Sequence, residues 1–97
     1  MHQKKELFSK DEWHELADSL SLSPRQSQIG RYLCLGLSDK QIANALQISV
    51  PTVRTHLSRL FLKFVVQDRH ELVIIFFRHF REQYSANGRS SKMMASG

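Results

Sequence analysis

The sequence predicts an all-α domain, a small helix-turn-helix bundle of four core helices with an extra helix at the N-terminus. Helix-start signals recur at short intervals, and the apolar residues between them repeat at the three-to-four-residue spacing of an α-helix. No alternating pattern of useful length for a β-strand appears apart from the run Leu72 to Phe77, which is ambiguous by periodicity alone. We interpret this run as helix because charged, helix-like sequence flanks it on both sides. With 97 residues, 41% of them apolar, the chain can fill one modest core.

The first three helices are predicted to begin at capping boxes. In a capping box a serine is followed three positions later by a glutamate or a glutamine, and the two residues bond each other's backbone N–H groups. The three pairs are Ser9 with Glu12, Ser23 with Gln26, and Ser38 with Gln41.

Other residue types mark the remaining helix boundaries. Pro24 occupies the first position of the second helix, where its missing N–H costs nothing, and Gly36 supplies a left-handed residue after that helix. Ser49 begins the fourth helix. Asp68 introduces the fifth, which we expect to run to about Gln83.

Three segments are expected along the chain: an N-terminal extension with an amphipathic helix over 1–20, the helical domain over 21–83, and a flexible tail over 84–97. Residues 1–20 carry three lysines against five carboxylates, a balance of −2, so the rest of the chain must carry +7 to give the net charge of +5. A basic body of this kind favours a polyanionic partner, most often nucleic acid.

The residue content argues against several other functions. Cys34 is the single cysteine, which excludes a disulfide within the chain and favours a reducing compartment, with the thiol as a small buried group. The five histidines do not stand at ligand spacing, so we expect neither a metal nor a cofactor. We find no pattern of catalytic residues and expect no enzyme. No apolar run spans a bilayer and the N-terminus lacks a signal peptide, which predicts a cytoplasmic protein without membrane contact.

Residues 36–57 describe a short helix, a tight turn and a longer helix, which is the helix-turn-helix arrangement. The small side chain of Ala43 lets the two helices approach closely. The apolar residues expected to meet inside this corner are Ile42, Leu46, Ile48 and Val53.

The longer helix has two different faces. Its predicted inward stripe, at positions i, i+4, i+7 and i+11, is Val53, Leu57, Leu60 and Phe64. The residues this leaves outward are Arg54, Thr55, Ser58 and Arg59. No acidic residue occurs between Ser49 and Val65. Such a face suits base edges in a major groove, where arginine bonds guanine at two acceptors, although a solvated basic face on a helical bundle is the simpler alternative.

From Leu22 to about Phe80 the sequence resembles the LuxR/FixJ-type (GerE-like) DNA-binding domain of bacterial regulators. The segments in register are 22–25, 36–43, 48–49, 52–56, Lys63, 68–69 and Glu71. The resemblance implies four packed helices, with the third in the major groove and the fourth pairing with its twin in a dimer. It implies base contacts by Arg54, Thr55 and Ser58. It also implies phosphate contacts by Lys40, Thr52, Arg59 and Lys63.

Two residues depart from the family pattern. Val65 stands where a glycine usually closes the third family helix, and a β-branched residue disfavours positive φ. Gly30 stands where a large apolar residue is usual. We hypothesise that the extra N-terminal helix fills this space with Trp13, the first residue of an apolar stripe that continues through Leu16, Ala17 and Leu20. The alternative is that Trp13 packs elsewhere on the bundle.

The last helix is more apolar than a core alone requires. One stripe is Val73, Phe77, Phe80 and Tyr84, and a second is Leu72, Ile75, Phe76 and His79. We predict that the second stripe is the interface of a homodimer, because a large exposed apolar patch usually marks an interface. The alternative is that the N-terminal helix covers it.

Together these patterns predict a sequence-specific transcription regulator that binds double-stranded DNA, with a separate regulatory protein as a further candidate partner. A sigma-factor promoter-recognition region uses similar residues around its turn, but the Asp68-Arg69 ending argues against it. A third alternative is a protein-interaction module that uses the apolar last helix and has lost DNA binding. Both a stand-alone regulator and a fragment of a larger one fit the sequence.

Overall fold

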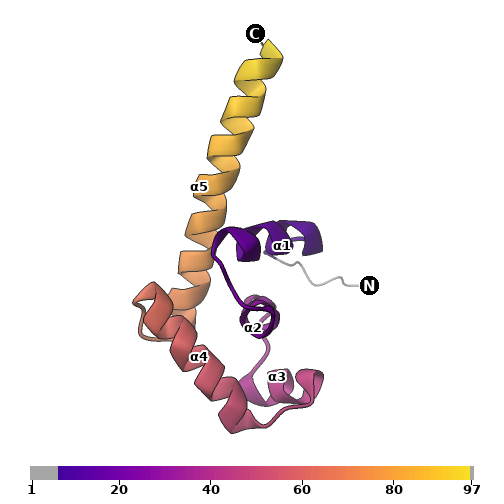
Figure 1. The fold of residues 1–97 in the computed structure, drawn as a ribbon, viewed down its shortest axis with the longest axis vertical. Coiled ribbons are helices and arrows are strands. Elements are labelled where there is room, and N and C mark those ends of the chain that lie inside the picture. Colours follow the sequence, from indigo (N-terminus) through magenta and orange to yellow (C-terminus); the bar gives the residue numbers. More distant parts are fainter. Residues whose placement is uncertain (1–6, 97) are drawn as a thin grey trace.

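The computed structural model describes residues 7–96, with side chains as far as Gln83, and this part of the chain is all-helical. The helices in order are α1 (Lys10–Ser19), α2 (Pro24–Cys34), α3 (Asp39–Leu46), α4 (Val50–Phe64) and α5 (Arg69–Ser96). Helix α2 lies at the centre and contacts all the others, while α1 also contacts α5 and α4 contacts both α3 and α5 (Figure 1). The predicted all-α bundle with an extra N-terminal helix is confirmed.

The predicted helix starts are all confirmed. The capping boxes at Ser9, Ser23 and Ser38 each form both of their hydrogen bonds, with lengths between 2.8 and 3.2 Å. Ser49 caps α4 by accepting a 3.2 Å bond from the Thr52 N–H. Asp68 Oδ1 accepts a 2.9 Å bond from the Glu71 N–H at the start of α5. Each start therefore depends on residues within four positions of one another.

Left-handed residues end the first four helices. Gly36 takes a φ of 85°, as predicted, whereas Ser21, Gln47 and Val65 take left-handed φ values of 57°, 61° and 55° without being glycine. Val65 therefore makes the same kind of turn between α4 and α5 that a glycine would make. The left-handed conformation of an L-residue costs about 1–2 kcal/mol, because its Cβ lies too close to the following carbonyl.

Helix α5 is longer than we expected from the sequence. It continues to Ser96 instead of ending near Gln83, and no proline follows Pro51 to block the continuing helix. Figure 1 shows this end of α5 extending away from the other helices. The side chains of residues 84–96 and all of Gly97 lie outside the described part, so the flexibility expected of residues 84–97 stays a prediction.

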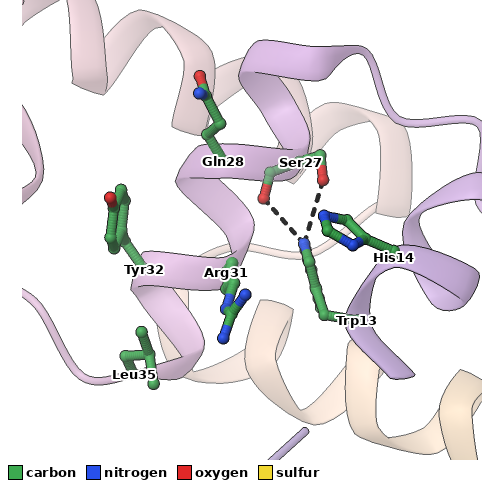
Figure 2. Close-up of a pocket in the computed structure, with 7 residues that line it drawn as sticks. All are labelled: Trp13, His14, Ser27, Gln28, Arg31, Tyr32 and Leu35. Carbon is green, nitrogen blue, oxygen red and sulfur yellow. Dashed lines mark hydrogen bonds between the residues drawn. The ribbon is translucent and has the colours of Figure 1, made fainter. Parts of the chain in front are cut away.

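Trp13 fills the space beside Gly30, as hypothesised. A Cβ added to Gly30 would lie 3.0 Å from the Cη2 and Cζ2 atoms of the indole and 3.4 Å from Cε2 of Phe76. The indole N–H donates to both the backbone carbonyl and the hydroxyl of Ser27, each at 3.1 Å (Figure 2). Since Trp13 is only 1% exposed, α1 belongs to the core of the domain.

Phe76 lies at the centre of an aromatic cluster that joins three helices. Its ring stands edge-on to Trp13 of α1 and to Phe64 of α4, with centroid distances of 5.3 and 5.5 Å. Phe76 and Leu72 are both 0% exposed. This corrects the expectation that the whole second stripe of the last helix is free for a partner, because two of its four residues are buried within the chain's own core.

Candidate nucleic-acid interface

The corner between α3 and α4 has the geometry that the sequence predicted. Ile42 and Val53 are fully buried where the two helices meet, and Ala43 is 5% exposed. The left-handed Gln47 turns the chain after α3, and the Ile48 N–H then donates a 3.0 Å bond back to the Ala43 carbonyl. The corner is held by buried apolar side chains and by backbone hydrogen bonds, so it fixes the direction in which α4 leaves.

Helix α4 has one buried face and one exposed polar face. Val53, Leu57 and Leu60 are buried, and Phe64 is half-buried against the core. The residues predicted to contact DNA are all exposed: Lys40, Thr52, Arg54, Thr55, Ser58, Arg59 and Lys63. Lys40 belongs to α3 and the other six to α4, so the structure leaves this set open to solvent on the helix-turn-helix unit.

Besides Arg54, three of these side chains already have partners within the chain. The Thr52 hydroxyl lies 2.8 Å from that of Ser49, and the Lys63 ammonium donates a 3.5 Å bond to the Ser21 carbonyl. The Thr55 hydroxyl donates to the Pro51 carbonyl at 3.0 Å. Because that proton is used inside the helix, the exposed Thr55 side chain retains an acceptor oxygen and a methyl group. A methyl group of this kind is suited to contact with the methyl of thymine.

Arg54 forms an ion pair that the sequence did not reveal. Its Nε donates to Asp39 Oδ2 at 3.2 Å, and the other oxygen of Asp39 accepts from Arg69 at the start of α5. Arg69 also donates to the Leu37 carbonyl at 3.3 Å. Asp39, Arg54 and Arg69 lie in three different helices, so only the packing of those helices brings them together. The sequence holds one signal for this ion pair. Asp39 stands at the first position of α3, and α4, the next helix along the chain, has basic residues but no acidic residue of its own.

A second group missed from the sequence surrounds His56. Partial burial, followed by the positive charges of Arg59 and Arg25, lowers the pKa of His56 below its ordinary value of 6.5. Arg25 lies in α2, which places one more cation within electrostatic reach of the exposed face of α4. The spacing of residues within α4 could not reveal Arg25, because Arg25 belongs to a different helix.

Leu62 is also absent from the predicted set. It is 79% exposed and follows Ser58 by four positions, on the outward face of α4. The sequence contains the signal for this placement, because Leu62 falls outside the inward stripe of the same helix. The exposed face of α4 is therefore polar and basic with one apolar residue near its end.

Other features of the structure lie apart from this face. A hollow of about 320 Å³ between α1 and α2 contains none of the predicted DNA contacts, and its lining residues are Trp13, His14, Ser27, Gln28, Arg31, Tyr32 and Leu35 (Figure 2). Burial raises the pKa of the Cys34 thiol to about 12, which keeps it protonated.

Two other kinds of site are absent from the described residues. No group of side chains there is arranged to hold a metal ion, and no helix there has the length and apolarity to cross a membrane.

An all-helical bundle with this corner, and with an exposed second helix of the corner that is free of carboxylates, is a helix-turn-helix domain of the DNA-binding class. The family model described as "Bacterial regulatory proteins, luxR family" matches residues 20–76, more than half of the chain. The protein belongs to this family of DNA-binding transcription regulators. Helix α1 ends just before the matched region.

Curated relatives support the same assignment. The response regulator protein VraR of Staphylococcus aureus is 40% identical over 58 residues, which is 60% of this chain and 28% of the relative. Proteins of the same name from Staphylococcus saprophyticus and Staphylococcus epidermidis match with the same values. The match therefore covers little more than a quarter of the length of these relatives. No solved structure matches the chain.

Proposed function

We propose that this protein regulates transcription by binding a specific sequence of double-stranded DNA, with α4 in the major groove. In this proposal Arg54, Thr55 and Ser58 contact bases. The residues that contact phosphates are Lys40, Thr52, Arg59 and Lys63. The proposal implies a cytoplasmic protein, because bacterial DNA lies there, and it leaves a separate regulatory protein as a further partner.

The observation that carries the proposal is the exposed face of α4. Its residues offer hydrogen-bond donors and positive charge, no carboxylate occurs in the helix, and its opposite face is buried, so the helix has a fixed orientation. Arginine is the residue that most often reads guanine, and it does so through two parallel hydrogen bonds. Membership of the luxR family supports DNA as the partner.

Selection from a pool of random duplex DNA tests the base contacts. The wild-type protein should enrich one site, and Arg54→Ala should lose discrimination at one base pair by roughly 5- to 150-fold, the range that a bidentate contact is worth. Arg54→Lys is the matched control because it keeps the positive charge and removes the planar guanidinium that forms the two parallel hydrogen bonds. It should also lose the discrimination while keeping most of the affinity for random DNA. Equal enrichment by all three proteins would contradict the proposal.

Salt dependence tests the phosphate contacts. The logarithm of the binding constant should fall linearly with the logarithm of the salt concentration, and Lys40→Ala should reduce that slope by about 0.9, the value for one phosphate contact. Lys10→Ala removes a lysine from the first turn of α1 and should leave the slope unchanged. Binding that does not respond to salt would instead favour a protein-interaction module.

We further propose that the protein binds as a homodimer through α5, on a surface smaller than the sequence predicted. Of the four predicted interface residues, His79 is exposed and Ile75 is half-buried, while Leu72 and Phe76 lie in the core. Two other apolar residues of α5 are open to solvent, Ile74 at 54% and Phe77 at 39%.

Analytical sedimentation tests the dimer. The wild-type protein should sediment as a dimer, and Ile74→Glu should convert it to a monomer because the substitution places a charge on the exposed apolar surface. A wild-type monomer at high concentration would rule the dimer out.

A further inference from the structure

We propose that Asp39 determines the sequence specificity of the protein without contacting DNA, by holding the Arg54 guanidinium in the orientation that reads a base. The inference rests on the proposed function of Arg54. It adds a positioning residue that lies in α3, outside the recognition helix.

The first support is the atom of Arg54 that Asp39 binds. The Asp39 carboxylate accepts from Nε, so this bond leaves the two terminal amino groups of the guanidinium available. Those two groups form the fork that matches the O6 and N7 acceptors of guanine. A carboxylate at Nε therefore restrains the plane of the guanidinium and leaves that fork free for a base.

The second support is that Asp39 is itself held in place. Its Oδ1 accepts from Arg69 Nη2, and the same guanidinium donates through Nη1 to the Leu37 carbonyl at 3.3 Å. The side chain of Asp39 is 21% exposed and that of Arg69 is 34% exposed, whereas that of Arg54 is 67% exposed. An anchored carboxylate thus restrains an otherwise solvent-exposed arginine, which reduces the rotamer entropy that Arg54 loses when it binds a base.

The third support is electrostatic. A carboxylate beside a DNA-binding face repels phosphates, so it weakens binding to DNA of any sequence. If Asp39 orients Arg54, its removal lowers discrimination at the base pair read by Arg54, while the affinity for random DNA stays the same or rises. A loss of fold would instead lower the affinities for the selected site and for random DNA together.

The test is competition binding of the full chain to three duplexes. These are the site that wild-type protein selects, the same site with the Arg54-dependent base pair replaced, and a random duplex. Asp39→Asn should lower the ratio of affinities for the first two by roughly tenfold, within the range for one bidentate contact. Its affinity for the random duplex should equal or exceed that of wild type.

Two variants serve as controls. Asp11→Asn removes a carboxylate from the first turn of α1, a helix without contact to α4 in the described structure, and it should change neither quantity. Asp39→Glu keeps the charge and displaces it by one methylene group. It should also lower the discrimination, and it replaces Asp39→Asn in the test if that variant does not fold.

A double variant separates positioning from a structural role. In the Arg54→Ala background, Asp39→Asn should cause no further loss of discrimination, because its effect passes through Arg54. A further loss there would overturn the inference, and so would full discrimination by Asp39→Asn or by its folded Asp39→Glu replacement. If Arg54→Ala loses discrimination and the Asp39 variants keep it, the inference alone fails. If Arg54→Ala also keeps it, the proposed base contact fails as well.

Discussion

Trp13 and Arg54 represent two regions of the molecule that are built in different ways. Around Trp13, helices α1, α2 and α5 pack aromatic and aliphatic side chains with almost no exposure. Around Arg54, helices α3 and α4 present polar side chains to solvent over a small buried corner. Within the described residues α1 contacts neither α3 nor α4, and α2 and α5 connect the two regions. Under the proposed function, stability and DNA recognition therefore depend on separate sets of side chains.

The largest effect is expected from Trp13→Ala. Removing the indole leaves a cavity and ends its bonds to Ser27, which should lower the free energy of unfolding by about 3–5 kcal/mol. Urea denaturation followed by circular dichroism measures the loss. Trp13→Phe should lose less because it keeps a ring. The protein that remains folded should discriminate between DNA sites as wild type does, and an unchanged thermal stability would remove Trp13 from the core.

Gly30→Ala probes the same region with the opposite change in volume. The added Cβ would lie 3.0 Å from the indole, and overpacking costs about 1–3 kcal/mol, against about 1 kcal/mol gained from helix propensity. We expect a net loss of about 1 kcal/mol. Gln28→Ala at an exposed position of α2 is the control. Repeating Gly30→Ala in the Trp13→Phe background should reduce the loss, and an equal loss there would place the clash elsewhere.

Val65→Gly should have a smaller effect, and it should stabilise the protein. The substitution removes left-handed strain of about 1–2 kcal/mol and adds about 0.5–1 kcal/mol of chain entropy to the unfolded state. Val65 is 89% exposed, so little burial is lost. We expect a net gain of about 0.5–1 kcal/mol, measured as a higher melting temperature with unchanged DNA discrimination. Val65→Ala should gain less because alanine keeps the Cβ, and a lower melting temperature for the glycine variant would contradict this account.

The smallest effect concerns His56 and pH. Its pKa in the folded protein lies below 6.5, so as the pH falls the unfolded chain takes up the proton first. The contribution of His56 to stability is therefore fully present above pH 6.5 and is lost as the pH falls below that value. Wild type should lose more stability than His56→Gln between neutral and mildly acid pH in paired denaturation curves. Parallel curves would show that partial burial and the charges of Arg59 and Arg25 do not lower the pKa of His56.

The local features of the fold were predictable because short segments determine them. A serine and a residue three positions later form each capping box, and the inward stripe of α4 follows from helical periodicity alone. The contact of Trp13 with Gly30 was also predictable, since an unusual small residue and a large one occurred in helices of the same bundle.

Features that depend on packing between distant segments were not predictable in the same way. The burial of Leu72 and Phe76 depends on the docking of the other helices onto α5, which periodicity within α5 does not show. The ion pair of Asp39 with Arg54 joins residues 15 positions apart on two helices. In both cases the sequence identifies a face of a helix, but the neighbour of that face is known only once the helices are assembled.

The positions of the glycines determine which substitutions this protein should tolerate. Three of the four left-handed positions in the described chain carry serine, glutamine or valine, while Gly30 stands in the ordinary backbone of α2 and is restricted by the indole above it. Glycine is usually required at left-handed turns and replaceable within helices, and we expect the opposite pattern of tolerance here. In a saturation library, the turns at Ser21, Gln47 and Val65 should accept glycine readily, while residue 30 within a regular helix should accept almost nothing else.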